Sequence, residues 1–199
     1  MLSSGETDAA RPKARALVDE LLPTAKSDQV IVATSTSCSM TLRSKYDTYL
    51  GMDDPGTDTV GGAVVDLCEY LRENHLDGLR NKLKPLPLKV LYHGPCQLRS
   101  HQIGLPAATL LRLVPKIDLH LSQADCCGIG GTYGYDVKKS ATSKAIGRTL
   151  MEQVEKVKPD VIVCDSETCR WNIEKNTDVE TIHPIQLLMR GITSNFVSK

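Results

Sequence analysis

Two adjacent cysteines followed by a glycine-rich run constrain this chain more than any other stretch of its sequence. The run covers residues 126–134 and reads CCGIGGTYG, with four glycines after the two thiols. Glycine accepts positive φ angles and lets the backbone come close to whatever the sulfurs hold. Few packing requirements demand such a turn, whereas the placement of sulfur ligands around a compact inorganic centre does. The stretch therefore predicts a metal centre with further ligands elsewhere in the chain.

The composition excludes several classes of protein. Lys and Arg number 24 and so do Asp and Glu, so no net charge draws the chain to nucleic acid or to an anionic membrane. One Trp and one Phe are too few for base-stacking platforms. No apolar run approaches the roughly 20 residues of a transmembrane segment, and the first residues do not resemble a signal peptide. Seven cysteines, an odd number, fit a reducing cytoplasm better than a disulfide scaffold.

Strands and helices alternate along the chain. Short apolar runs predict strands at 30–33, 88–93, 117–121 and 161–164. Helical periodicity predicts helices at 7–22 (closed by Pro23), 40–50, 64–74, 105–114 and 140–157, one from Arg170, and a last one ending at Gly191. The polar stretch 51–59 predicts a loop. The alternation predicts an α/β fold with a parallel sheet and with cysteines at the C-terminal ends of its strands.

The chain also contains an internal repeat. Residues 30–38 and 161–169 both read as a strand, a Ser-x-x-Cys turn and the start of a helix, at an offset of 169 − 38 = 131. The same offset carries Cys126 to a position before Met1, so the first copy has no counterpart of the adjacent cysteines. The stiff connector Lys84-Pro85-Leu86-Pro87 predicts a domain boundary. We therefore expect two related strand–helix units, an incomplete one at 1–86 and a complete one at 87–199.

The cysteines of the second unit each follow a predicted strand. Their order is Cys96-x29-Cys126-Cys127-x36-Cys164-x4-Cys169. Since parallel strands end at one edge of a sheet, we expect these thiols to meet there. Four or five thiolates suit a soft metal. Zinc is one alternative, but the side chains of adjacent cysteines diverge and suit different irons of a cluster better than one tetrahedral ion.

Several of these residues also have a plain structural interpretation. Cys68 lies on an apolar helical stripe and is expected in the core. Cys164 ends a strand that is apolar on both faces, so it is either a fifth ligand or a core residue. Cys38 cannot hold a cluster by itself. His93 and His183 either serve the fold or donate hydrogen bonds to a cluster.

Three segments carry a resemblance to a known family. They are YHGPC ending at Cys96, CCGIGGTYG from Cys126, and DSETCRWNIE around Cys169, with His183-Pro184 beyond them. Together they closely resemble the cysteine-rich CCG domain found in the C subunits of anaerobic glycerol-3-phosphate dehydrogenases. The wider group includes the B subunit of heterodisulfide reductase and the iron–sulfur subunit of glycolate oxidase.

The resemblance implies an iron–sulfur cluster, of the [4Fe-4S] type and in some members non-cubane. Its ligands would be Cys96, Cys126, Cys127 and Cys169, with Cys164 as a spare. The resemblance also implies a non-catalytic electron-transfer subunit of an oxidoreductase. Such a subunit accepts electrons from a flavin-containing dehydrogenase subunit and passes them toward a membrane-associated quinone-reducing complex, so a peripheral place at the inner membrane face is implied as well.

Two departures from the family leave alternatives open. The family usually has Cys-x-x-Cys after the last strand, whereas this chain has Ser166 in the first position, and a hydroxyl is a poorer iron ligand. The family's N-terminal ferredoxin-like domain and complete first CCG unit are not seen in this sequence. A thiol/disulfide enzyme using Cys126 and Cys127, and a structural remnant without a cluster, are therefore the competing hypotheses.

Overall fold

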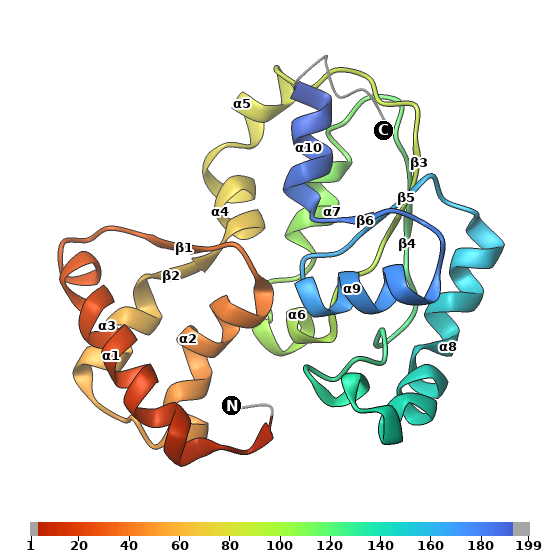
Figure 1. Ribbon diagram of the computed structural model, residues 1–199. Coiled ribbons are helices and arrows are strands. Elements are labelled where there is room, and N and C mark those ends of the chain that lie inside the picture. Colours follow the sequence, from red (N-terminus) through yellow and green to blue (C-terminus); the bar gives the residue numbers. More distant parts are fainter. Residues whose placement is uncertain (1–3, 193–199) are drawn as a thin grey trace. The chain divides into compact units, whose positions relative to one another are not determined.

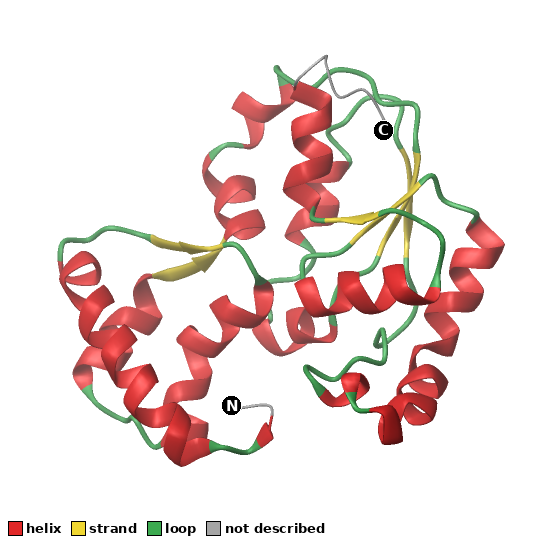
Figure 2. Cartoon of the chain, in the orientation of Figure 1, coloured by secondary structure: helices red, strands yellow, loops and turns green. Residues whose placement is uncertain are grey.

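The computed structural model describes residues 4–192 and divides the chain into two compact units that meet at Leu67 and Cys68. In each unit helices alternate with strands, and every strand pair is parallel (Figures 1 and 2). The predicted α/β class is therefore confirmed.

The first unit contains two strands and three helices among its described residues. In chain order they are α1 (Thr7–Lys26), β1 (Ile31–Ala33), α2 (Thr36–Leu50), α3 (Pro55–Ala63) and β2 (Val64–Asp66). β1 and β2 pair with Ile31 opposite Val64. Their inner faces and the helices enclose a core that includes Val18, Leu50 and Val60.

Three predictions for the first unit are wrong. Helix α1 continues past Pro23 to Lys26, so this proline does not close it. The predicted loop 51–59 contains the start of α3, because Asp54 caps the N–H groups of Gly56 and Thr57 and a proline follows at the first helical position. Residues 64–66, predicted as helix, form β2, because tertiary pairing with β1 overrides their helical periodicity.

The second unit is built on a four-stranded sheet. The first elements in chain order are α4 (Leu67–Asn74, which begins at the junction of the units), α5 (Leu76–Arg80), β3 (Lys89–Tyr92), α6 (Cys96–His101), α7 (Pro106–Leu111) and β4 (Asp118–Leu121). After two short 3₁₀ turns at Tyr133–Tyr135 and Val137–Lys139 come α8 (Ser140–Val157), β5 (Val161–Val163), α9 (Glu167–Asn176), β6 (Thr181–Ile182) and α10 (Pro184–Ile192). The strand order is β4-β3-β5-β6.

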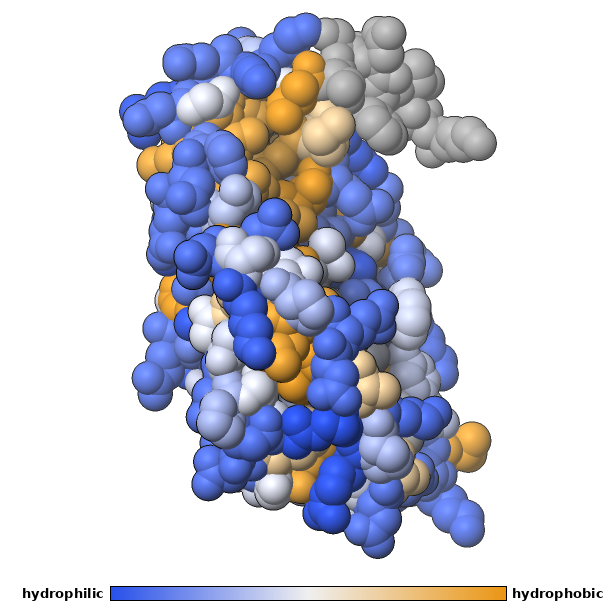
Figure 3. All heavy atoms as spheres, turned by 90° about the vertical axis from the view of Figure 1, so that its left-hand side faces the viewer, coloured by the Kyte–Doolittle hydropathy of each residue, from blue (hydrophilic) through white to orange (hydrophobic). Residues whose placement is uncertain are grey.

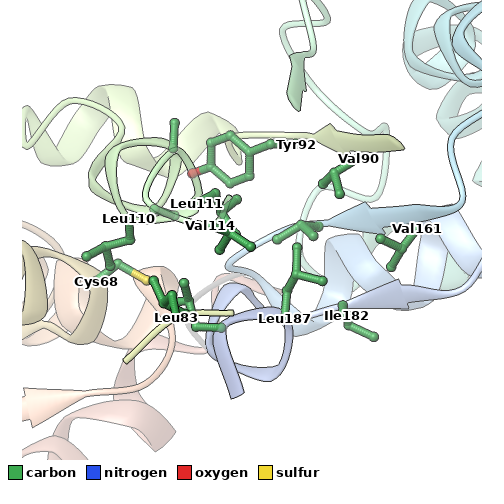
Figure 4. Close-up of a cluster of buried hydrophobic side chains, with 14 residues drawn as sticks. Cys68, Leu83, Val90, Tyr92, Leu110, Leu111, Val114, Val161, Ile182 and Leu187 are labelled. Atoms are coloured by element: carbon green, nitrogen blue, oxygen red, sulfur yellow. The ribbon is translucent and has the colours of Figure 1, made fainter. Parts of the chain in front are cut away.

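Buried apolar side chains cover both faces of this sheet. One face carries Val90, Tyr92 and Val161 against α7 and α10 (Figure 4). The other carries Leu91 and Ile162 against α8 and α9. Cys68 joins the first cluster, which confirms its predicted place in the core. Because α4 brings Cys68 into this cluster, the compact units divide after Leu67. The connector at 84–87 stays a prediction for the boundary between the two related strand–helix units.

The internal repeat reappears as matching geometry. Helix α2 begins at Thr36 and α9 begins at Glu167, again 131 residues apart. Each is preceded by an extended N-cap serine whose hydroxyl pairs with the side chain two residues on, 2.9 Å for Ser35 with Ser37 and 3.3 Å for Ser166 with Thr168. The strand pairs also match, because Ile31 faces Val64 as Ile162 faces Thr181.

Candidate metal centre

The sheet brings the cysteines of the second unit to one edge. Cys96 is the first residue of α6, directly after β3, whereas Cys164 and Cys169 follow β5. β3 and β5 are neighbours, and the chain leaves them in opposite directions, toward β4 and toward β6. In such sheets the crevice beyond the strand ends at this point is the usual ligand site. The loop after β4 delivers Cys126 and Cys127 to the same place.

The five sulfurs lie in a row along which each thiol interacts with the next. Cys96 is hydrogen-bonded to Cys126, and Cys126 to Cys127. Cys127 is hydrogen-bonded to Cys169, and Cys169 to Cys164. Cys96 is exposed and Cys126 half-buried, while the other three are buried. The structure thus brings together all five predicted residues, including the doubtful Cys164, and leaves Cys38 in the other unit.

The thiols of the row shift one another's pKa values in opposite directions. Hydrogen bonds from the thiols of Cys127 and Cys96, together with the Gly128 N–H at 3.3 Å, hold the pKa of Cys126 well below its usual range. The hydrogen bond to Cys126, together with burial, raises the pKa of Cys96 and that of Cys127 far above the usual range. The hydrogen bond with Cys127 lowers the pKa of Cys169, but the hydrogen bond with Cys164 and burial raise it by more, so the pKa of Cys169 lies above its usual range. The hydrogen bonds within the row therefore favour the thiolate form at Cys126 over that of its neighbours.

The glycine run lets the cysteine loop lie directly on α8. Gly128 has φ +97°, and a Cβ there would lie 2.1 Å from the carbonyl oxygen of Ser143. On the helix side, a Cβ at Gly147 would lie 2.4 Å from the carbonyl oxygen of Cys127. That carbonyl also accepts a 2.8 Å hydrogen bond from the side chain of Asn172 on α9. Two helices therefore fix the backbone at Cys127.

Gly147 and Asn172 were not predicted from the sequence as site residues. A glycine inside a helix costs stability relative to alanine, so its presence in α8 was a usable sign of close packing. Asn172 gave no such sign, because only the fold brings it to a carbonyl 45 residues away.

His93 is buried beside the row of sulfurs. Its Nδ1 lies 3.4 Å from the hydroxyl of Ser122, and that hydroxyl accepts the N–H of Ala124 at 3.1 Å. Its Nε2 has no hydrogen-bond partner among the described residues. Burial lowers the pKa of His93 to about 4, although the nearby Cys126 acts in the opposite direction. His183, in contrast, serves the fold, since its Nδ1 accepts the N–H of Ile185 at the start of α10.

Two further features adjoin the sulfurs. The hydroxyl of Ser166 lies 3.3 Å from that of Thr168 and also interacts with Cys169, where the family pattern would have a thiol. A cavity of about 380 Å³ reaches Cys127 and is lined by Lys144, Arg148 and Asn172 among others. The cavity therefore lies where the backbone of the cysteine loop meets α8 and α9.

The side chains fit a thiolate-ligated metal in type. Among residues 4–192, no three or more His, Cys, Asp or Glu side chains are arranged to hold a metal ion. The sulfurs instead contact one another in sequence. Because metal binding replaces thiol protons, rearrangement of the row is expected on loading. Thiolates favour iron–sulfur clusters and other soft metals.

Comparison with known proteins gives a family match for the segment that carries the five sulfurs. Residues 90–174 match the family model described as a cysteine-rich domain, CCG. The matched segment contains all five sulfurs that lie beyond the strand ends, together with β4, β5 and nearly all of β3.

Named relatives extend the match over nearly the whole chain. The C subunit of the anaerobic glycerol-3-phosphate dehydrogenase of Escherichia coli K12 is 37% identical over 194 residues, 96% of this chain and 48% of that protein. The B subunit of the fumarate reductase (CoM/CoB) of Methanothermobacter marburgensis is 24% identical over 94% of this chain and 35% of its own length. An uncharacterized iron–sulfur protein of Methanocaldococcus jannaschii is 30% identical over 55% of this chain and 22% of its own. The chain thus spans about half the length, or less, of these relatives.

Proposed function

We propose that this chain is an iron–sulfur electron-transfer subunit, or the C-terminal part of one, of the anaerobic glycerol-3-phosphate dehydrogenase type. The observation that carries the proposal is the row of five sulfurs at the strand ends of a CCG domain. The match of nearly the whole chain to the C subunit of such a dehydrogenase supports it. In this role the chain relays electrons from a flavin-containing subunit toward a quinone-reducing complex and makes no substrate bonds itself.

The proposed ligands are Cys96, Cys126, Cys127 and Cys169, with Cys164 in reserve. The cluster is proposed to be [4Fe-4S], in the cubane or the non-cubane form, and its chemistry is the gain and loss of one electron. The chain's own contribution is to present thiolates from three separate loops. The backbone N–H of Gly128 already donates to the sulfur of Cys126, and hydrogen bonds of this kind stabilise the charge on sulfur.

The domain arrangement and location are part of the same proposal. Residues 87–199 are proposed as a complete CCG unit and 1–86 as an incomplete one. Within residues 4–192 the structure contains no helix of the length and apolarity that a bilayer requires. We propose a cytoplasmic location for the chain. Its membrane-associated partner complex would hold it at the inner membrane face.

Anaerobic purification followed by iron and sulfide analysis and EPR tests the proposal. We expect iron and sulfide in equal amounts, a visible absorption band and an EPR signal on oxidation or reduction. Cys96→Ser and Cys169→Ser should each remove most of the iron, whereas Cys68→Ser, in the apolar core, should leave the iron-to-protein ratio unchanged wherever the variant folds. A protein that takes up no iron on anaerobic reconstitution would rule the proposal out.

A thiol/disulfide enzyme is the second candidate, favoured by the lowered pKa of Cys126 next to a second thiol. Metal-free protein should then reduce a disulfide with a dithiol as electron donor, and Cys126→Ser should abolish turnover. If turnover is absent, this candidate fails.

A structural remnant without a cluster is the third candidate, motivated by Ser166 in place of a cysteine. Uptake of iron by Ser166→Cys but not by the parent protein would support it. Equal iron content in the two proteins would count against it.

A further inference from the structure

Strand β3 directs the side chain of His93 to the face of the sheet that carries the sulfurs. Side chains alternate along a strand, so His93 points to the same face as Leu91. Leu91 packs there in a buried cluster that includes three of the five sulfurs, those of Cys127, Cys164 and Cys169. The backbone N–H of His93 donates to the carbonyl oxygen of Val163 at 2.9 Å. This bond extends the β3–β5 pairing by one residue and sets His93 beside Cys164.

The imidazole of His93 contains a buried polar atom without a partner among residues 4–192. The side chain is 0% exposed, and its Nε2 has no hydrogen bond to any described residue. Hydrophilic residues cover most of the face of the molecule shown in Figure 3, where bulk water satisfies polar atoms. His93 has no such access to water. Because buried polar groups in native proteins are nearly always hydrogen-bonded, Nε2 requires a partner of another kind.

Ser122 determines which ring nitrogen of His93 carries the hydrogen. Burial lowers the pKa of His93 to about 4, so the ring is neutral at pH 7 and has one N–H. The hydroxyl oxygen of Ser122 accepts the N–H of Ala124 at 3.1 Å. Its single hydrogen has Nδ1 of His93 as an acceptor, at 3.4 Å. The hydrogen of the ring is then on Nε2, and the atom without a partner is a donor.

We propose that His93 is a positioning residue whose Nε2–H donates a hydrogen bond to a sulfur of the bound cluster and raises its reduction potential. The inference rests on the proposed function, since a cluster is the acceptor. His93 interacts electrostatically with Cys126, which places the ring at the row of sulfurs. A hydrogen bond to sulfur stabilises the reduced, more negative form of a cluster, so it favours the uptake of an electron.

A redox titration of the anaerobically reconstituted whole protein, followed by EPR, tests the hydrogen bond. His93→Leu removes the donor, so the equilibrium constant for one-electron reduction should fall at least tenfold, a downward shift of about 59 mV or more. His93→Gln restores an N–H donor and should recover most of this shift. His75→Leu, at an exposed histidine, should leave the potential unchanged. Iron content, measured on every variant, separates a changed potential from a lost cluster.

Two further measurements do not depend on His93→Leu folding. NMR of metal-free protein labelled with 15N-histidine should show the hydrogen of His93 on Nε2. Ser122→Ala removes the hydroxyl that fixes this tautomer, so part of the population should move its hydrogen to Nδ1. The loaded Ser122→Ala protein should then have a lower potential than the parent, by less than the shift for His93→Leu.

Four results would overturn the inference while leaving the proposed function intact. They are an unchanged potential in iron-loaded His93→Leu, an unchanged potential in Ser122→Ala, a ring hydrogen on Nδ1 in the metal-free parent, and a strong 15N coupling to the cluster in pulsed EPR. The last result would make His93 an iron ligand instead of a donor. A parent protein that binds no iron would overturn the proposed function and this inference together, so the two failures are distinguishable.

Discussion

The side-chain amide of Asn172 donates a 2.8 Å hydrogen bond to the carbonyl oxygen of Cys127. The donor is on α9 and the acceptor is in the loop after β4, so this bond ties two of the three cysteine-bearing connections together. The bond is buried, and a buried carbonyl that loses its donor costs about 1–3 kcal/mol.

Asn172→Ala is therefore expected to lower the free energy of unfolding of the second unit by about 1–3 kcal/mol. In metal-free protein it should also speed alkylation of Cys127, which is otherwise buried. Urea denaturation and mass spectrometry of the alkylated peptides measure the two effects. Lys175→Ala, on the exposed side of the same helix, is the matched control. Equal stability of the two variants would show that the bond does not hold the loop.

Gly128→Ala is expected to disrupt the contact between the cysteine loop and α8. Its φ of +97° and a contact of 2.1 Å from the new Cβ to Ser143 both oppose a side chain. We expect a loss of about 2–4 kcal/mol, from backbone strain and overpacking together. Gly62→Ala in α3, where a Cβ meets nothing within 4 Å, should instead be neutral or stabilising by up to about 1 kcal/mol. Thermal unfolding followed by circular dichroism compares the two variants.

His93 should make the second unit less stable in mild acid. Burial lowers the pKa of His93 to about 4 from an ordinary value of 6.5. Between these two values the unfolded chain binds a proton that the folded chain does not. Stability is therefore complete above pH 6.5 and falls as the pH decreases toward 4, by up to about 3 kcal/mol.

Comparison of the parent with His93→Gln isolates this effect from the titration of the thiols. The difference between their free energies of unfolding should shrink or reverse from pH 7 to pH 4.5. The free energy of unfolding of His75→Gln, a substitution at an exposed position, should differ from that of the parent by the same amount at both pH values. A constant difference between His93→Gln and the parent would contradict the prediction.

Asp54 should make the first unit sensitive to stronger acid. Its hydrogen-bonded ion pair with Arg15, and the N–H of Thr57, hold the pKa of Asp54 well below its usual range. The contribution of Asp54 to stability is present at neutral pH. It is lost as the pH falls below the pKa of Asp in the unfolded chain and through the lower pKa of Asp54 in the folded chain.

Two variants separate the ion pair from the helix cap. Asp54→Asn keeps a capping oxygen for α3 but loses the charge, so we expect a smaller destabilisation than for Asp54→Ala, which loses both. Chemical denaturation at pH 7 and at pH 3 measures the free energy of unfolding of each variant relative to the parent. The gap between each variant and the parent should narrow from pH 7 to pH 3 without closing, because the lowered pKa keeps Asp54 ionised in the folded state at pH 3. A gap of equal size at both pH values would show that the charge of Asp54 is not involved.

The sequence was informative where local signals agreed with the fold. Helix 140–157 was predicted with its observed bounds, because its apolar face is regular and a proline follows. The convergence of Cys96, Cys126, Cys127 and Cys169 followed from the rule that parallel strands end at one edge. Whether these four residues bind a metal stays a prediction for the experiments above.

The remaining features depend on contacts between distant residues. The strand at 64–66 exists because β1 lies beside it, and its sequence alone favours a helix. The hydrogen bond of Asn172 joins residues 45 positions apart. The cover over Val161 and Val163 comes from α7 and β3, so the identical triplet at 30–32 gives no hint that it would remain exposed.

The row of sulfurs also has a consequence for how the second unit holds together. Its members come from three connections that leave three different strands, and 73 residues (169 − 96) separate the first proposed ligand from the last. A centre bound to all of them would act as a cross-link that closes long loops and restricts the unfolded chain. Protease resistance of residues 68–192 would then report the loading state, so that a cell could degrade empty copies while sparing filled ones.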